Sequence, residues 1–108
     1  MIKDISPNDS EHKFYELSEF DEIVLKIVYE EVNGSIDKSI PEYQVYLSLG
    51  KEFDPDTSKQ NIITKTIINL INIGLLNNDI RTDYSKKSLL VMNIYLTLEG
   101  KVYIENMQ

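Results

Sequence analysis

The chain has 108 residues, of which 42% are hydrophobic and 27% are charged, and it contains no cysteine. This length supports one domain with one hydrophobic core, and the missing cysteines exclude a disulfide framework, a thiolate nucleophile and a thiolate metal ligand. No apolar run approaches the roughly 20 residues of a membrane span, and the first residues lack the apolar region of a signal peptide, so we expect a cytoplasmic protein.

The net charge of −7 is unevenly distributed along the chain. Residues 1–56 carry a net charge of −9, residues 57–96 carry +3, and residues 97–108 carry −1. Binding to nucleic acid needs Lys and Arg against the phosphates, so the total charge argues against it. The positive segment has the opposite sign and is the part of the chain where nucleic-acid binding is expected.

The first predicted elements are a polar arm over residues 1–17 and a helix that opens a domain spanning residues 18–108. Ser18 followed three residues later by Asp21 resembles a capping box. The apolar residues that follow recur at helical spacing until Asn33-Gly34, a pair typical of a helix end. The sequence therefore predicts a first helix that begins at Ser18 and ends before Asn33.

A second, shorter helix is predicted after a connection in which Ile36 is the candidate for a short strand. Ser39 is its expected N-cap, with Pro41 in the first turn, where a missing N–H costs little. Gly50 is its expected C-terminal stop.

A third, longer helix is predicted after the loop around Asp54-Pro55-Asp56. Asp56 or Thr57 is expected to cap it, and Gly74 to end it. The apolar positions expected to face the core are Ile62, Ile63, Ile67, Leu70 and Ile71. The positions expected on the other side are Ser58, Lys59, Asn61, Thr64, Lys65 and Asn69.

The period of the pattern then changes to two, which predicts strands over residues 77–82 and 88–96 joined by a turn. Thr97 is expected to cap a last helix, with Gly100 at its third position, where a missing side chain lets the helix pass close to the hairpin or the first helix. These elements predict an α+β fold, a winged helix-turn-helix with three helices, a two-stranded hairpin wing and a short C-terminal helix.

Two segments carry a resemblance to a known family: "ITKTIINLINIGLLNND" and, some twenty residues later, "YLTLEGKVYIE". They resemble the winged-helix regulators of the MarR and PadR type, over about residues 18–106. The chain departs from that pattern in two respects. It lacks the long terminal helices through which MarR proteins dimerise, and its loop from Lys51 to Asp56 is longer and more acidic than a tight helix-turn-helix turn.

The residues predicted to contact DNA follow from the docking geometry of such a fold. A recognition helix enters the major groove with its N-terminal half leading, and Gln, Asn, Lys, Ser and Thr side chains can bond to base edges or phosphates there. The candidates on the helix are Ser58, Lys59, Gln60, Asn61, Thr64 and Lys65. The candidates on the hairpin are Arg81, Lys86 and Lys87, which are expected to reach the minor groove or the backbone.

No catalytic site, metal or cofactor is expected. The single histidine, His12, lies in the polar arm, and the carboxylate pairs Glu30-Glu31 and Asp54/Asp56 have no predicted pocket to shift their pKa values. The sequence predicts a sequence-specific double-stranded DNA-binding protein, a transcriptional repressor that acts as a homodimer. The alternatives are a centromere-binding protein of a plasmid or phage partition system, and a winged helix that binds a protein partner through its acidic N-terminal half instead of DNA.

Overall fold

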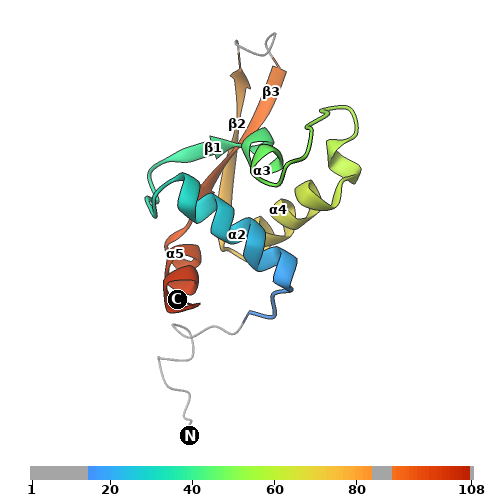
Figure 1. Cartoon of the computed structure of the whole chain (residues 1–108). Helices are drawn as coiled ribbons and strands as arrows, with labels where there is room; N and C mark the ends of the chain where they lie inside the picture. The colour runs from blue at the N-terminus through green and yellow to red at the C-terminus, as the bar shows by residue number, and fades with distance from the viewer. Residues whose placement is uncertain (1–14, 84–88, 108) are drawn as a thin grey trace, which may run out of the picture.

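The chain folds into four α-helices and a three-stranded antiparallel sheet over the residues that the computed structural model describes, 15–83 and 89–107 (Figure 1). The α+β class predicted from the sequence is confirmed. The elements in chain order are α2 (Glu19–Glu31), β1 (Ser39–Pro41), α3 (Glu42–Ser48), the 3₁₀ turn η1 (Ser58–Gln60), α4 (Ile62–Asn72), β2 (Leu76–Asp83), β3 (Leu89–Leu96) and α5 (Leu98–Met107).

The start of α2 is a complete capping box, as predicted. The Ser18 hydroxyl accepts a hydrogen bond from the Asp21 backbone N–H at 3.1 Å, and the Asp21 carboxylate accepts one from the Ser18 backbone N–H at 3.0 Å. The predicted end is also confirmed, because Asn33 and Gly34 both adopt positive φ values, of 53° and 72°. A left-handed backbone cannot continue a right-handed helix.

Substitution of the cap residue, Ser18→Ala, is expected to lower the free energy of unfolding by about 1 kcal/mol, because the first turn of α2 loses the acceptor for an otherwise unpaired N–H. Urea denaturation followed by circular dichroism measures the change. Ser48→Ala, at the exposed end of α3, is the matched control and is expected to change stability by less than about 0.5 kcal/mol. Equal losses in the two variants would contradict the capping role.

The sheet has three strands in the order β1-β3-β2, where the sequence predicted only a two-stranded hairpin. The added strand is β1, in which Ile40 pairs with Ile94 of β3. The prediction of Ser39 as a helix cap is therefore wrong, and Pro41 is the N-cap of α3 instead. A residue before proline avoids the helical region, so Ile40 is held extended, and the edge of β3 pairs with it. Ile36, the expected strand residue, is exposed.

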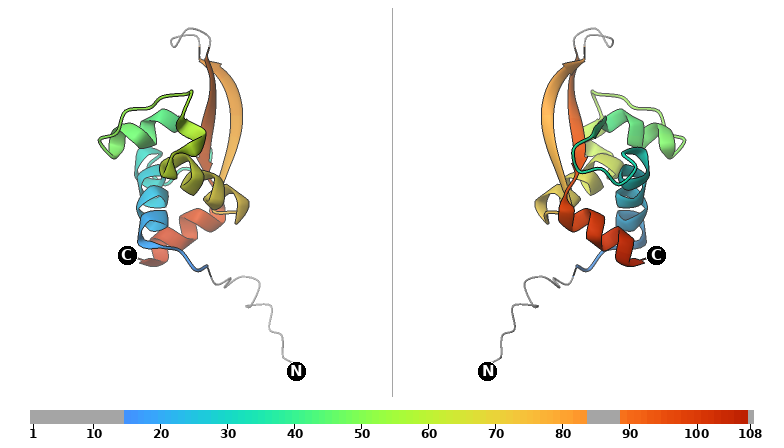
Figure 2. Two further views of the ribbon diagram at one scale, coloured as in Figure 1. Left: turned by 90° about the vertical axis from the view of Figure 1, so that its right-hand side faces the viewer. Right: turned by 90° about the vertical axis from the view of Figure 1, so that its left-hand side faces the viewer.

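The β2–β3 hairpin is confirmed to within one residue at each described end. Its register runs from Leu76 opposite Leu96 to Asp83 opposite Leu89. The predicted turn falls mostly on residues 84–88, outside the described residues. The described part of the hairpin extends beyond the helices at the end of the molecule opposite α5 (Figures 1 and 2).

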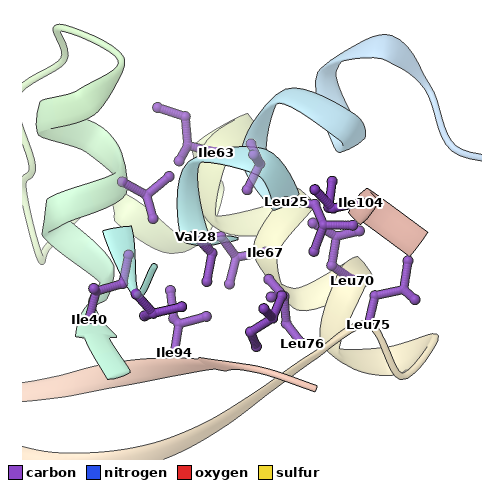
Figure 3. Packing of buried hydrophobic residues seen from close by; sticks show 14 of the residues in the cluster. Leu25, Val28, Ile40, Ile63, Ile67, Leu70, Leu75, Leu76, Ile94 and Ile104 are labelled. Atoms are coloured by element: carbon purple, nitrogen blue, oxygen red, sulfur yellow. The ribbon is translucent and has the colours of Figure 1, made fainter. Parts of the chain in front are cut away.

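The hydrophobic core lies between α2, α4 and the sheet and is closed at one end by α5 (Figure 3). Each of these elements contributes fully buried side chains, among them Leu25 and Val28 of α2, Ile67 and Leu70 of α4, Leu76 of β2, Ile94 of β3 and Ile104 of α5. Because protein interiors are close-packed, these contacts fix the direction of α4 and therefore which of its residues face outward.

Thr97 joins the end of α4 to the start of α5, as well as capping α5 as predicted. Its hydroxyl accepts a hydrogen bond from the Gly100 N–H at 3.0 Å and donates one to the Gly74 carbonyl at 2.7 Å. The predicted close approach at Gly100 is also present: a Cβ atom added there would overlap the carbonyl oxygen of Leu75, the residue before β2. The absence of a side chain at Gly100 therefore allows α5 to pack against the base of the hairpin.

Candidate nucleic-acid interface

Helix α4 begins later than the sequence predicted. Neither Asp56 nor Thr57 caps it. The chain first makes the 3₁₀ turn η1, and Asn61 is then the N-cap, its side-chain oxygen accepting a hydrogen bond from the Ile63 backbone N–H at 2.8 Å. Asn is among the strongest N-cap residues and Thr is weaker, which favours this start. Lys59 and Gln60 therefore lie in the turn before the helix rather than in its first turn.

The outward face of α4 differs from the predicted one at two positions. Ile62, expected in the core, is 63% exposed, and Thr64, expected to face outward, is only 3% exposed. The buried side is formed by Ile63, Thr66, Ile67 and Leu70, together with Thr64. The exposed side of the helix carries Ile62, Lys65, Ile68, Asn69 and Asn72.

Thr64 is buried because residues of α3 satisfy its hydroxyl. It donates a hydrogen bond to the Glu42 carboxylate at 2.5 Å, and the Tyr46 hydroxyl lies 2.6 Å from it. The Tyr46 hydroxyl oxygen also lies 3.4 Å from the backbone carbonyl oxygen of Ser58. This chain of hydrogen bonds connects α3, η1 and α4. Its buried residues stabilise the outward face of α4 but are not part of that face.

The acid in this chain of hydrogen bonds, Glu42, is buried. Burial raises the pKa of Glu42 above its ordinary value, and the hydrogen bond from Thr64 opposes part of the rise. A buried carboxylate is costly unless it is hydrogen-bonded. The packing of α3 on α4 therefore depends on the Thr64 hydroxyl.

The predicted DNA-contacting residues fall into four groups. Lys59, Gln60 and Lys65 are exposed around the start of α4, whereas Ser58 and Thr64 are buried and correct the prediction that they face outward. Asn61 is exposed, but its side-chain oxygen caps the helix. The hairpin candidates are Arg81, whose backbone pairs with Val91 in the sheet, and Lys86 and Lys87, which lie outside the described residues.

The start of α4 and the outer part of the hairpin lie toward the same end of the molecule, away from α5 (Figures 1 and 2). Residues 57–78 contain no Asp or Glu, so no carboxylate of the α4 segment opposes Lys59 or Lys65. The preceding loop is acidic, and its exposed Asp54 accepts a hydrogen bond from the backbone N–H of Asp56 at 2.9 Å. The cationic part of this surface therefore begins at Lys59.

Sequence reasoning missed Ile62 and Asn72 as outward-facing residues. A signal for Ile62 was present in the pattern. With Asn61 as the N-cap, residues 63, 66, 67 and 70 form the apolar face at the spacing i, i+3, i+4, i+7, and Ile62 falls outside it. The prediction places Asn61 among the groove-contacting residues and the helix start at Asp56 or Thr57, so it misses the role of Asn61 as the cap.

Among residues 15–83 and 89–107, no group of three or more His, Cys, Asp or Glu side chains is arranged to hold a metal ion. No helix within these residues has the length and apolar character needed to cross a membrane.

Comparisons of the chain with protein-family models, with curated proteins and with solved structures gave no match.

Proposed function

We propose that this chain is a winged helix-turn-helix protein that binds double-stranded DNA, with α4 in the major groove and the β2–β3 hairpin as the wing on the minor groove or backbone. The single observation that carries the proposal is the outward face of η1 and α4. It presents Lys59, Gln60 and Lys65 to solvent in a segment free of carboxylates. The order of two helices, a longer helix, a hairpin and a short helix supports the same reading.

The proposed contacts divide into two kinds. Lys59 and Lys65 neutralise phosphates or reach guanine, and Gln60 bonds to a base edge at the entry of the groove. Arg81, Lys86 and Lys87 are proposed as hairpin contacts from their place in the sequence. Ser58 and Thr64 are left out because their side chains are buried.

The small number of cations implies a dimer. About five basic contacts per subunit, with a slope near −0.9 for each neutralised phosphate, give a modest and strongly salt-dependent affinity. Two subunits on a two-fold site, with their α4 helices about 34 Å apart, would supply useful specificity. We propose a homodimeric transcriptional repressor on this ground.

Charge reversal tests the proposal. Lys59→Glu and Lys65→Glu are each expected to weaken binding to a mixed-sequence duplex about tenfold at about 50 mM salt and to reduce the salt slope by about 1. Fluorescence anisotropy across a salt series measures both quantities. The matched control is Lys26→Glu, because Lys26 is an exposed lysine of α2 and the net charge changes equally.

Absence of duplex binding by the wild-type protein at low salt would refute the proposal, as would equal effects in all three variants. Cooperative binding along repeated sites would favour the partition function over a repressor. The exposed carboxylates of α2 (Glu19, Glu30 and Glu31) favour the remaining alternative, a protein partner bound through the acidic helix. Affinity lost on Lys26→Glu alone would not fit either DNA function.

A further inference from the structure

Ile62 is the most exposed large hydrophobic residue among residues 15–80 and 92–107, whose side chains the structure describes. It is the first residue of α4, directly after the Asn61 cap, and Lys59, Gln60 and Lys65 are exposed around it. Single exposed apolar residues are common on protein surfaces. The position of this one is specific, since the first turn of a groove-binding helix is the part that meets base edges.

We infer that Ile62 contacts the C5-methyl group of a thymine in the major groove and that α4 thereby selects A·T base pairs. The inference rests on the proposed function and adds to it the class of target sequence. The thymine methyl is the apolar group among the base edges of the major groove. Contact between the isoleucine side chain and the thymine methyl group is favourable because both apolar groups leave water. Contact with a polar base edge lacks this favourable contribution.

The neighbouring residues on the same face agree with this choice of base pair. Asn69, which lies two turns after Ile62, is exposed on the same side of α4, and an amide side chain can make two hydrogen bonds to adenine. Gln60 offers the same chemistry before the helix. Residues 57–78 contain no Arg, the residue most often paired with guanine, and no Asp or Glu to accept from cytosine. Lys59 and Lys65 can also reach guanine, and in this inference they are assigned to phosphates.

The surface chemistry also favours DNA over a protein as the occupant of this face. Ile62 is separated from Ile68, the next exposed apolar residue of α4, by Lys65 and by a buried stretch. The fully buried core of a protein–protein interface is depleted in charged residues and Lys is disfavoured there. In a DNA complex the lysine would pair with a phosphate while the neighbouring isoleucine contacts the methyl group of a thymine.

The test uses three duplexes of about 24 base pairs, two helical turns and more: alternating dA-dT, alternating dA-dU and alternating dG-dC. The dA-dU duplex lacks only the C5-methyl groups. The wild-type chain is expected to bind dA-dT more tightly than dA-dU by about fourfold for each subunit that places Ile62 on a thymine methyl group, the effect of one buried methyl-sized group, and to bind dG-dC more weakly than dA-dT.

Three variants assign the effect to Ile62. Ile62→Ala is expected to bind dA-dT and dA-dU equally, and Ile62→Leu to restore the preference for dA-dT, since it restores a large aliphatic side chain. Ile36→Ala, an equally sized truncation at an exposed isoleucine in the connection before β1, is the control and is expected to keep the wild-type preference.

The outcomes separate the inference from the proposed function. Lysine-dependent duplex binding with no preference between dA-dT and dA-dU, or with a preference that survives Ile62→Ala, would overturn the thymine contact and leave DNA binding standing. Failure to bind any of the three duplexes would overturn both. Equal loss of preference in Ile62→Ala and Ile36→Ala would also overturn the assignment to Ile62.

Discussion

Gly100→Ala is expected to lower the free energy of unfolding by about 3 kcal/mol, although alanine is the better helix former. The added Cβ would overlap the backbone carbonyl of Leu75 and would lie 3.1 Å from the Leu96 side chain. The Leu75 carbonyl oxygen also accepts a hydrogen bond from the Thr97 backbone N–H, which restrains its position. Relief of the overlap requires α5 to move away from the base of the hairpin. Chemical denaturation measures the loss.

The matched control is Gly50→Ala. A Cβ at Gly50 would meet no atom within 4 Å, but the residue has a φ of +70°. The expected loss is therefore only the cost of a left-handed backbone for an L-residue, about 1 kcal/mol. A loss at Gly100 no larger than the loss at Gly50 would show that α5 adapts without strain and would contradict the proposed close packing.

Thr64→Val is expected to cost about 2 to 3 kcal/mol near neutral pH, because it removes the hydroxyl that donates to the buried Glu42 carboxylate and leaves the shape of the side chain nearly unchanged. The loss also depends on pH. The pKa of Glu42 is raised by burial in the folded state, so the stability associated with this carboxyl is present at low pH and is lost as pH rises through the folded-state pKa. Without the Thr64 hydrogen bond, that pKa rises further.

The difference in unfolding free energy between wild type and Thr64→Val is therefore expected to be smaller at acidic pH than at neutral pH, because the carboxyl, whose pKa is raised by burial, takes up its proton as the pH falls. Urea denaturation at both pH values measures it. Thr66→Val is the control: Thr66 is also buried in α4 but lies outside the Glu42–Thr64–Tyr46 chain. A pH-independent loss at Thr64, or the same pH dependence at Thr66, would contradict the role assigned to Glu42.

Local signals in the sequence predicted those parts of the fold that local interactions determine. The Ser18 capping box, the stop at Asn33-Gly34, the two long strands and the Thr97 cap all involve residues within a few positions of one another. Each has a physical meaning that does not depend on the rest of the chain. The close approach at Gly100 was also predicted, because a glycine inside a helix is costly without a structural reason.

The features that the sequence did not predict depend on distant partners. β1 has only three residues, and it forms because its backbone can pair with the edge of β3. The preference of a residue before proline for an extended backbone does not by itself identify a strand. Thr64 has both a methyl and a hydroxyl group, so its polar character suggested exposure. Its burial became possible only because Glu42 and Tyr46 of another helix meet its hydroxyl.

The sequence predicted which segment forms the candidate interface, but only some of the residues that are exposed there. The segment around Lys59 and Lys65 is exposed as expected. The error at Ile62 and Thr64 came from the assumed helix start and from reading each residue type as wholly polar or wholly apolar. Residue identity alone could not reveal that Ile62 is the apolar position on the proposed DNA-facing side.

The placement of β3 in the middle of the sheet has a consequence for how the chain folds. Both β1 and β2 precede β3 in the sequence, yet each pairs only with it. During synthesis, α2, α3 and α4 are made before the strand that completes the sheet over their apolar side chains. The β1–β3 pairing, which brings Ser39 opposite Tyr95, spans a long sequence separation, and such pairing slows folding and leaves hydrophobic surface exposed in the meantime. A ribosome-bound chain that ends before β3 is therefore expected to aggregate more readily than a chain that includes β3.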